Sequence, residues 1–405
     1  MNRSLRLVPS PSQEEKAEHP AEKFISPTVT AVPPSGIRKF FDLISQTEGV
    51  ISLGVGEPDF ATPWHIREAA LYNLERGRTN YTANAGLPEL RQAINRYLLR
   101  KRGLSYHWKE EILVTVGASE AIDLALRSVL QKGDEVVIPE PTFVSYSPCT
   151  RFAGGTPVPL PLSADQNFQI SREQLLGVIS PRTKIILICS PNNPTGSILN
   201  EESLRAIADV AREFDLLVIA DEIYSELTYG QTYRSIATFE GMQERTVVVS
   251  GLSKSFAMTG WRIGYAAGPA PLIAAMNKIH QYSLMCAPTL GQMAAVEALE
   301  NGEEQMQQMV QEYGRRRRVM LEGFRRMGLD CFEAQGAFYL FPSIKKTGLD
   351  DEQFAARLLA EEKVAVVPGS AFGRSGSGHI RCSYATSLET LQEALKRMGR
   401  FVRSL

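Results

Sequence analysis

One lysine, Lys254, stands among small and polar residues in the stretch GLSKSFAMTGWRIGY (251–265), and Arg262 follows it. A lone lysine is usually a solvated surface charge. In a buried site, however, a lysine has a lowered pKa and acts as an amine nucleophile and base. Arg262 offers forked donation to a dianion, so this stretch has the chemistry to hold an anionic group beside a reactive amine.

Further polar and aromatic residues follow short apolar runs elsewhere in the chain. The ligand crevice of an open α/β sheet lies at the carboxyl ends of its strands. If these runs are neighbouring parallel strands, the residues that end them meet in one crevice. The four runs and their end residues are VVIPEPTF with Phe143, IILICSPNNPTG with Asn193, LLVIADEIY with Asp221 and Tyr224, and VVVSGLSK with Ser253 and Lys254.

A phosphate site is predicted in TVGASEAI (115–122), where Gly117, Ala118 and Ser119 open a helix. Exposed N–H groups and the helix dipole at such a start favour a phosphate. A phosphorylated aromatic cofactor bound to a lysine would use the lysine, the acid, the aromatic ring and the phosphate site together. Pyridoxal 5′-phosphate fits, because it forms a Schiff base with lysine and needs an acidic partner for its ring nitrogen.

The elements that must position these residues alternate along the middle of the chain. Val- and Ile-rich runs that are apolar on both faces are typical of buried parallel strands, and amphipathic helices lie between them. The pattern predicts an α/β domain around a mostly parallel sheet, flanked by helices. The predicted strands are 133–141, 183–191, 215–222 and 246–253, and the predicted helices include 118–133 and 200–214.

The chain becomes mainly helical after about residue 290, with short strands predicted in 336–344 and 379–385. This pattern favours a second, smaller α+β domain. The predicted boundaries are a flexible tail over 1–24, a large domain over 50–290, and a small domain built from 25–49 and 291–405.

Composition excludes several classes of partner. Lys and Arg number 44 against 45 Asp and Glu, so no bulk field would draw the chain to nucleic acid or an anionic membrane. The basic run Arg315–Arg318 is interpreted as a solvated helix face. Five scattered cysteines show no metal spacing and indicate reduced thiols, so no metal is expected. Without a signal peptide or a membrane-spanning run, the expected location is the cytoplasm.

The motifs SPNNPTG, ADEIYSEL, SGLSKSFAMTGWRIGY and GEPDF (56–60), with a late Arg381, resemble the class I/II aminotransferases of fold type I. The resemblance runs from about Pro27 to the C-terminus. A closer similarity, to the bacillus-type N-acetyl-diaminopimelate (PatA-like) aminotransferases, appears in SGIRKF, YTANAG, SELTYG, HQYSLMCA, GAFYLFPSIK and VVPGSAF.

The resemblance implies catalytic roles for three residues. Lys254 would form the aldimine and then shuttle the substrate Cα proton. Asp221 would pair with the pyridinium N–H, which offsets the cost of burying its charge. Tyr224, together with Asn193, would hydrogen-bond the phenolic oxygen of the cofactor and favour its ionised form.

The remaining cofactor contacts are also implied by the resemblance. Phe143 would stack on the pyridine ring. Ala118, Ser119, Ser253 and Arg262 would bind the phosphate. The family often has a serine where this chain has Gly251, so Ser253 is the expected hydroxyl donor and Ser250 the alternative.

Substrate recognition and assembly follow from three further positions. Arg381 would clamp the α-carboxylate in a bidentate pair, with Asn193 beside it. Gly36, in SGIRKF, would approach the substrate, with Ile37 and Arg38 as candidates for side-chain recognition. Tyr81 would cross a homodimer interface to the phosphate of the partner, so an isolated protomer would have an incomplete site.

The function implied is a ping-pong transaminase acting between an amino acid and a 2-oxo acid in biosynthetic amino-acid metabolism. N-acetyl-L,L-diaminopimelate with 2-oxoglutarate is the first expectation, and an aromatic or aspartate aminotransferase is the alternative. A carbon–sulfur β-lyase would use the same cofactor and first steps. A transcriptional regulator is disfavoured, because the 24-residue tail is too short for a DNA-binding unit.

Overall fold

The computed structural model describes residues 19–34 and 48–405. The chain separates into two compact units, Met1–Pro33 and Pro34–Leu405. The first unit contains a short 3-10 helix, Glu22–Phe24, and the helix α1, Pro27–Thr30, and neither element has a buried residue. The tail predicted over 1–24 lies mostly outside the described residues and stays a prediction.

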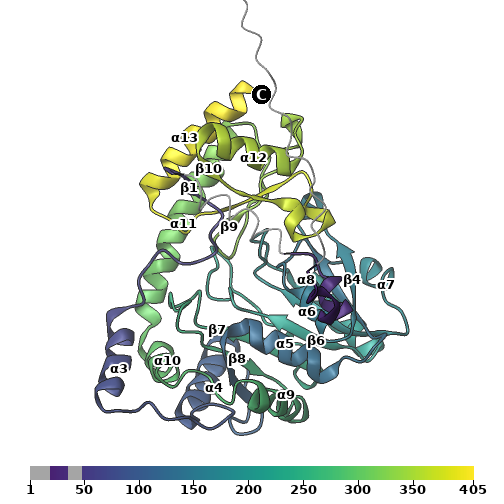
Figure 1. The fold of residues 1–405 in the computed structure, drawn as a ribbon, viewed down its shortest axis with the longest axis vertical. Coiled ribbons are helices and arrows are strands. Elements are labelled where there is room, and N and C mark those ends of the chain that lie inside the picture. The colour runs from purple at the N-terminus through teal and green to yellow at the C-terminus, as the bar shows by residue number, and fades with distance from the viewer. Residues whose placement is uncertain (1–18, 35–47) are drawn as a thin grey trace, which may run out of the picture. The chain divides into compact units, whose positions relative to one another are not determined.

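A central sheet of seven strands organises the part of the second unit that the structure describes (Figure 1). All neighbouring pairs are parallel except those of β8, which runs antiparallel to β2 and β7. The predicted α/β class with a mostly parallel sheet is confirmed. In spatial order the strands are β2 (Ile112–Thr115), β8 (Gly264–Ala267), β7 (Thr246–Gly251), β6 (Leu217–Asp221), β5 (Thr183–Cys189), β3 (Glu135–Glu140) and β4 (Thr156–Pro161).

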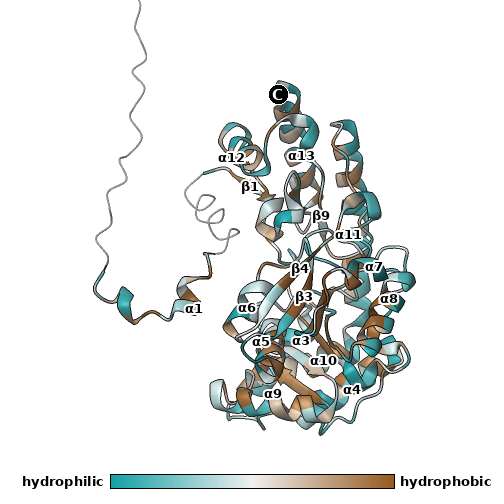
Figure 2. Cartoon of the chain, turned by 90° about the vertical axis from the view of Figure 1, so that its right-hand side faces the viewer, coloured by the Kyte–Doolittle hydropathy of each residue, from teal (hydrophilic) through white to brown (hydrophobic). Residues whose placement is uncertain are grey.

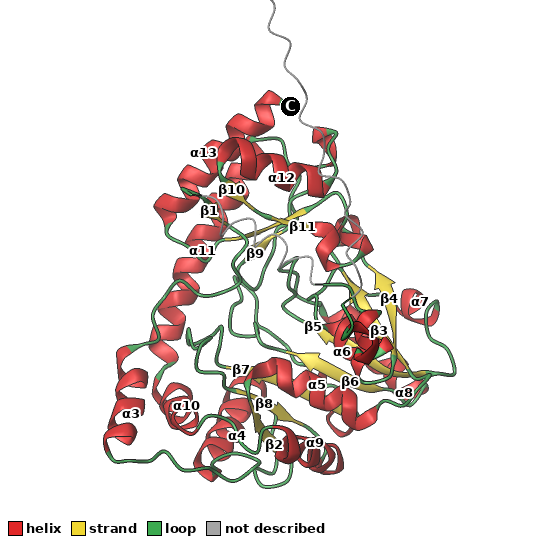
Figure 3. Ribbon diagram, in the orientation of Figure 1, coloured by secondary structure: helices red, strands yellow, loops and turns green. Residues whose placement is uncertain are grey.

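Helices cover both faces of this sheet, which explains the apolar runs (Figure 3). Within β5, Ile185 and Leu187 belong to the hydrophobic cluster that contains α5 (Gly117–Val129). Ile186 and Ile188 belong to the other cluster, with α8 (Glu201–Glu213). Because successive strand residues point to opposite faces, both sets must be apolar. Figure 2 shows hydrophobic colour along strands of the sheet and mixed hydrophobic and hydrophilic colour on the helices.

Strand direction brings the predicted site residues to one edge of the sheet. The strands β2, β3, β5, β6 and β7 run the same way, so their carboxyl ends share that edge. Since β8 runs the opposite way, it begins at the same edge with Gly264, just after Arg262. A single reversed strand therefore returns the chain with its arginine beside the ends of the parallel strands.

The C-terminal part of the second unit is mainly helical with small sheets, as predicted. Its helices are α10 (Thr289–Asn301), α11 (Glu303–Arg326), α12 (Asp351–Glu362) and α13 (Leu388–Ser404), while α9 (Ala270–Ser283) precedes it and packs against α5 and β2. The strand β12 (Ile380–Ser383) lies between β11 (Val367–Pro368) and β9 (Tyr339–Leu340), antiparallel to both. In addition, β1 (Ile51–Ser52) pairs with β10 (Val364–Ala365), so the segment before GEPDF joins the C-terminal part. The predicted domain boundaries themselves remain a prediction.

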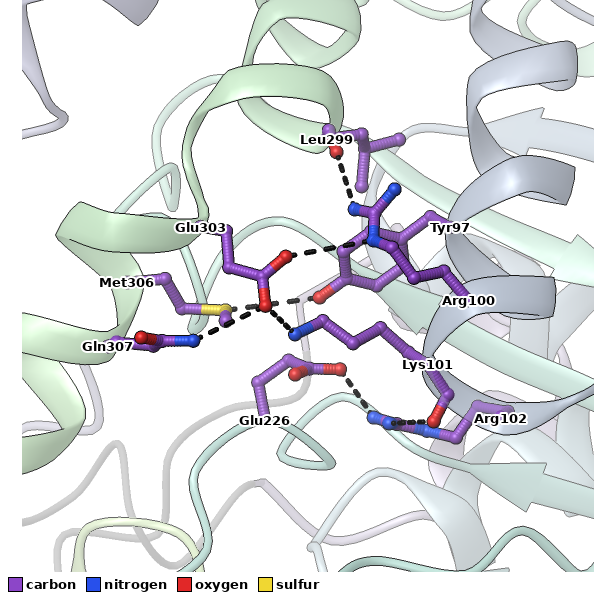
Figure 4. Close-up of polar contacts among 9 residues, drawn as sticks. All are labelled: Tyr97, Arg100, Lys101, Arg102, Glu226, Leu299, Glu303, Met306 and Gln307. Atoms are coloured by element: carbon purple, nitrogen blue, oxygen red, sulfur yellow. Dashed lines mark hydrogen bonds and ion pairs between the residues drawn. The ribbon is translucent and has the colours of Figure 1, made fainter.

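Four more helices complete the described part of this unit: α3 (Trp64–Glu75), α4 (Pro88–Arg102), α6 (Tyr146–Phe152) and α7 (Arg172–Leu176). The end of α4 is tied to the start of α11 by an ion pair between Lys101 and Glu303 (Figure 4). Arg102, next along α4, forms a largely buried ion pair with Glu226. Exposed ion pairs contribute little to stability, whereas breaking a buried one leaves an uncompensated charge. Arg102 and Glu226 therefore hold the segment after β6 against α4.

Two of the four arginines in the basic run on α11 differ from the interpretation as a solvated face, whereas Arg315 and Arg318 are exposed as expected. Arg316 and Arg317 are buried, with 6% and 8% of their surfaces exposed. Arg316 Nη1 donates to both carboxylate oxygens of Asp59, at 2.8 and 2.9 Å. Arg317 pairs with Glu333 at 3.3 Å. Glu312 in the same helix also pairs with Arg316, at 3.1 Å, but Asp59 and Glu333 lie outside the helix, so the local sequence could not indicate them.

The contact between β8 and the start of α5 predicts the effect of one substitution. A Cβ atom at Gly264 would lie 2.4 Å from the backbone nitrogen of Ala118. We expect Gly264→Ala to lower the free energy of unfolding by about 1–3 kcal/mol, because backbone must shift to make room. The matched control is Gly314→Ala in α11, where a Cβ would meet its nearest neighbour at an ordinary 3.5 Å. Denaturant unfolding of both variants would measure the difference, and equal stabilities would contradict the prediction.

Candidate active site

A cavity of about 670 Å³ opens at the carboxyl edge of the central sheet. Most of the residues predicted from the sequence line it, although they come from six separate segments of the chain. Those that line it are Ala118, Ser119, Phe143, Asn193, Asp221, Tyr224, Ser253, Lys254, Arg262 and Arg381.

Two predicted positions are not in this cavity. Tyr81 does not line it, and 80% of its surface is exposed. Gly36 lies outside the described residues, as do Ile37 and Arg38. The predicted roles of these residues stay predictions.

Lys254 presents its amine to the cavity. Its Nζ donates a hydrogen bond to the carbonyl oxygen of Gly56 at 2.7 Å. Burial lowers the pKa of Lys254 to about 8, and the positive charges of Arg381 and Arg262 add to this effect while Glu57 opposes it. A substantial fraction of the side chain is thus a neutral amine near pH 8, the form that acts as a nucleophile.

Asp221 ends β6 with its carboxylate almost fully buried, at 5% exposure. Oδ2 accepts a hydrogen bond from the Tyr146 hydroxyl at 2.6 Å, and Oδ1 accepts one from the Ile223 N–H at 3.1 Å. Burial raises the pKa of Asp221 in spite of these hydrogen bonds. Among the described residues no Lys, Arg or His forms an ion pair with this carboxylate, so the site has a place for a cationic N–H.

The start of α5 and Arg262 form a cradle at one end of the cavity. Arg262 Nη1 donates to the carbonyl oxygen of Thr259 at 3.1 Å. Its Nη2 lies against Gly117, where a Cβ atom would come within 2.4 Å. Gly117 also has a φ of 76°, which favours glycine. The close approach leaves the first N–H groups of α5 and the guanidinium side by side.

Arg381 and Asn193 meet at another wall of the cavity. Arg381 is 3% exposed, and its Nη1 donates to Asn193 Oδ1 at 3.0 Å. Its Nη2 donates to the carbonyl oxygen of Gly54 at 2.6 Å. Arg381 Nε is buried without a hydrogen-bond partner among the described residues. The guanidinium is thus held in place by neutral acceptors and retains a free donor.

The two candidate serines occupy different places. Ser253 lines the cavity. Ser250 instead donates to the carbonyl oxygen of Glu222 at 3.3 Å and does not line it. Glu222 is turned away from the cavity, since its carboxylate accepts a hydrogen bond at 2.5 Å from the Ser235 hydroxyl. The geometry favours Ser253 over Ser250 as a donor to a ligand in the cavity.

Sequence reasoning missed several cavity residues, among them Glu57, Tyr146, Cys189 and Tyr339. Tyr146 lies three positions after Phe143, and the two rings pack edge to face at 5.7 Å. Phe143 precedes α6, which begins at Tyr146, so no helical spacing in the sequence indicated that the two rings meet. Tyr339 comes from β9, and the GAFYLF run shows only an apolar strand. No local signal in that run indicates that a hydroxyl faces the site.

The sequence profile described as "Aminotransferase class I and II" matches residues 48–398. The chain belongs to the class I and II aminotransferases. This aminotransferase is similar to several relatives along nearly its whole length, and 94% of the chain aligns with each of the three named next. The Bacillus subtilis protein YugH, a candidate aminotransferase, is 55% identical over 98% of its length. An aspartate aminotransferase of Pyrococcus abyssi is 46% identical over 98% of its length. A candidate N-acetyl-LL-diaminopimelate aminotransferase of Bacillus subtilis is 42% identical over 96% of its length.

Solved aminotransferase structures share this fold. The aromatic aminotransferase of Pyrococcus horikoshii superposes with a TM-score of 0.87 at 43% identity, covering 90% of this chain and 99% of that one. The aspartate aminotransferase of Thermus thermophilus with maleate gives a TM-score of 0.89 at 40% identity, covering 93% and 99%. The predicted recognition and fold type are confirmed.

Aminotransferases of this family depend on pyridoxal 5′-phosphate, and this aminotransferase is a pyridoxal-phosphate-dependent transferase. The donor set fits the cofactor at three points. The cradle of Arg262 and the start of α5 suits a phosphate. The buried carboxylate of Asp221 suits a pyridinium N–H, and the amine of Lys254 suits the aldehyde. Across the described residues, no helix is both long enough and apolar enough to span a bilayer.

The lowered pKa of Lys254 predicts how fast the cofactor-free enzyme captures its cofactor. The rate constant should rise with pH through about 8 and then level off, because the neutral amine is the reacting form. An ordinary lysine, with a pKa of about 10.4, would keep gaining reactivity up to about pH 10. Stopped-flow absorbance of cofactor binding from pH 7 to 10 measures this. A rate that still rises tenfold per unit above pH 9 would contradict the prediction.

The hydrogen bond from Tyr146 to Asp221 predicts a second effect. We expect Tyr146→Phe to raise the pKa of Asp221 further and to weaken cofactor binding about 5- to 30-fold, the equivalent of about 1–2 kcal/mol. Equilibrium dialysis of the cofactor at neutral pH gives the affinity. The control is Tyr106→Phe, because the buried Tyr106 hydroxyl has no hydrogen-bond partner among the described residues. Unchanged affinity in Tyr146→Phe would count against the role of this hydrogen bond.

Proposed function

We propose that this aminotransferase moves the amino group of an amino acid to a 2-oxo acid in two half-reactions, with Lys254, Asp221 and Tyr224 as its catalytic residues. The observation that carries the proposal is one cavity lined by an amine, a buried carboxylate and a buried guanidinium, from Lys254, Asp221 and Arg381. An amine that can be neutral supplies a nucleophile and a base. The guanidinium supplies a bidentate partner for an α-carboxylate.

The residues of the chain divide the work around the cofactor, which supplies an electron-withdrawing ring when bound. Asp221 would hold a proton on the ring nitrogen, and Tyr224 and Asn193 would donate to the phenolic oxygen. Phe143 packs on the ring face. Lys254 Nζ would take the proton from the substrate Cα and deliver it to the C4′ carbon of the cofactor within the same half-reaction, and it would carry a proton the opposite way in the second half-reaction.

The phosphate would be held by residues at the start of α5 and by Arg262. Arg262 and the first N–H groups of α5, at Ala118 and Ser119, lie in the cradle described above, and Ser253 adds a hydroxyl. This anchor fixes the ring with respect to Lys254. By anchoring the phosphate, these residues would keep a bound cofactor within reach of the Lys254 amine, which would lower the entropy cost of each proton transfer.

The proposed substrate pair is N-acetyl-L,L-diaminopimelate with 2-oxoglutarate, supported by the similarity to the Bacillus subtilis relative of that name. Arg381 binds the α-carboxylate, with Gly36 and Asn193 beside the substrate. Aspartate is the second candidate, because a relative named aspartate aminotransferase is 46% identical. Aromatic amino acids are the third, through the similarity to the aromatic aminotransferase structure.

The proposed working unit is a homodimer in the cytoplasm. Tyr81 is 80% exposed, and Tyr282, at 85%, is likewise a large exposed side chain. The segments that carry them are joined, since Asn84 Nδ2 donates to the carbonyl oxygen of Met285 at 2.7 Å. An exposed aromatic pair of this kind suits an interface with a second copy. Tyr81 would then reach the phosphate of the partner subunit.

A donor screen tests the substrate. The purified enzyme with bound cofactor is mixed with single amino acids, and the absorbance of the cofactor is followed without any 2-oxo acid. We expect N-acetyl-L,L-diaminopimelate and glutamate to convert the cofactor in one turnover, and 2-oxoglutarate to reverse the change. Conversion by aspartate or by aromatic amino acids alone would overturn the substrate assignment. Release of pyruvate and ammonia from a cysteine conjugate would instead indicate a β-lyase.

Lys254→Ala is the matched variant for the screen. Its turnover should fall at least a thousandfold, because both the amine nucleophile and the proton carrier are lost. Lys184→Ala, which removes a lysine paired with Asp134 outside the cavity, serves as the control. Full turnover in Lys254→Ala would refute the proposed mechanism.

A further inference from the structure

Tyr339 is a buried cavity residue to which neither the family motifs nor the predicted site assigned a role. It belongs to β9 in the C-terminal part of the second unit, and only 1% of its surface is exposed. Its strand pairs with β12, which carries Arg381. Tyr339 therefore approaches the cavity from the same small sheet as the proposed carboxylate-binding residue.

The hydroxyl of Tyr339 contacts the proposed cofactor-binding residue Tyr224. The two hydroxyl oxygens are 2.9 Å apart, and the rings pack edge to face at 5.8 Å. Both side chains are buried, so neither hydroxyl has bulk water as an alternative partner. In such surroundings a hydrogen bond is strengthened, and its loss leaves a costly unpaired group.

The ring of Tyr339 contacts Arg381. The guanidinium carbon lies 4.5 Å from the ring centroid of Tyr339, and 4.9 Å from that of Phe372. A cation over an aromatic face is stabilised by the ring, and the effect grows when the pair is desolvated. The positive charge in turn makes the phenol of Tyr339 a better hydrogen-bond donor. One side chain therefore touches both the proposed substrate anchor and a proposed cofactor anchor.

The backbone beside the cavity is shaped around this hydroxyl. A Cβ atom at Gly56 would lie 2.6 Å from the oxygen of Tyr339. The carbonyl oxygen of the same Gly56 accepts the hydrogen bond from Lys254. The glycine of GEPDF thus allows Tyr339 to reach the site without displacing the acceptor of the lysine.

We propose that Tyr339 is a positioning residue for Tyr224. Its hydroxyl donates a hydrogen bond to the Tyr224 oxygen, so that the Tyr224 proton points toward the cofactor. Its ring contacts Arg381 and so couples the Tyr224 hydroxyl to that guanidinium. The inference rests on the proposed roles of Tyr224 and Arg381. If Tyr224 donates into the cavity, its oxygen is free to accept, and the Tyr339 hydroxyl is the donor placed to supply that bond. The hydrogen-bonded hydroxyls of Tyr339 and Tyr224 then connect the Arg381 side of the cavity to the cofactor.

A double-mutant cycle on the enzyme with bound cofactor tests the coupling. The variants are Tyr339→Phe, Tyr224→Phe and the double substitution, and the readout is the pH midpoint of the cofactor absorbance change. We expect Tyr339→Phe to move the midpoint about half a pH unit upward, because the ionised phenolic oxygen loses part of its stabilisation. In the Tyr224→Phe background the same substitution should have no effect. An equal shift in both backgrounds, or no shift in either, would overturn the proposal.

A second variant separates the ring from the hydroxyl. Tyr339→Leu removes the aromatic face as well, so it should raise the KM for the amino donor about 3- to 10-fold more than Tyr339→Phe does, with a smaller change in kcat. The control is Tyr384→Phe, a buried tyrosine outside the cavity whose hydroxyl donates to the carbonyl oxygen of Ala337 at 3.1 Å. Equal KM values for the Phe and Leu variants would remove Arg381 from the proposal. Because the absorbance midpoint is measured without any amino donor, failure of the substrate assignment and failure of this inference give different results.

Discussion

The rest of the site is arranged around the buried carboxylate of Asp221. It sits at the end of a central strand, with 5% of its surface exposed and two hydrogen bonds that do not offset the cost of burial. Burial raises the pKa of this carboxyl, and a cationic group bound beside it would stabilise the charged form. The fold concentrates its polar residues around that point. Tyr146 fixes the direction of one carboxylate oxygen, and Lys254 arrives from the next strand.

Parallel strands gather polar residues around Asp221 because each strand ends at the same edge of the sheet. The reversed strand β8 completes the arrangement, since it brings Arg262 to the edge at its beginning and not at its end. The glycines at 117 and 264 then let helix α5 and β8 approach closely enough to form the phosphate cradle. The position of Arg262 therefore depends on the direction of β8 and on the close packing of β8 against α5. A change that separates these two elements would also displace the arginine.

Much of this arrangement could be predicted from the sequence, because long apolar runs mark strands that are buried on both faces. The four predicted strands appear as β3, β5, β6 and β7 within a few residues. β2 and β8 are four residues each, and β4 is a partly exposed edge strand with three prolines, so none of them shows a full run. Ten predicted residues line the cavity because motifs follow strand ends. Tyr339 could not be found this way, since its contacts with Tyr224 and Arg381 are made across the fold. Arg316 was misjudged for the same reason, because Asp59 lies far from it in sequence.

The pairing of β1 with β10 has a consequence for how ligands come and go. It places Gly54 and Gly56 beside the cavity, and their carbonyl oxygens accept hydrogen bonds from Arg381 and Lys254. Each cation therefore already has a neutral partner. A ligand that takes up either cation exchanges one hydrogen bond for another, so the net gain is smaller than the new contact alone. When the product leaves, the same carbonyls take the cations back. The two backbone carbonyls therefore hold the Lys254 and Arg381 side chains toward the cavity and compete with a ligand for these donors.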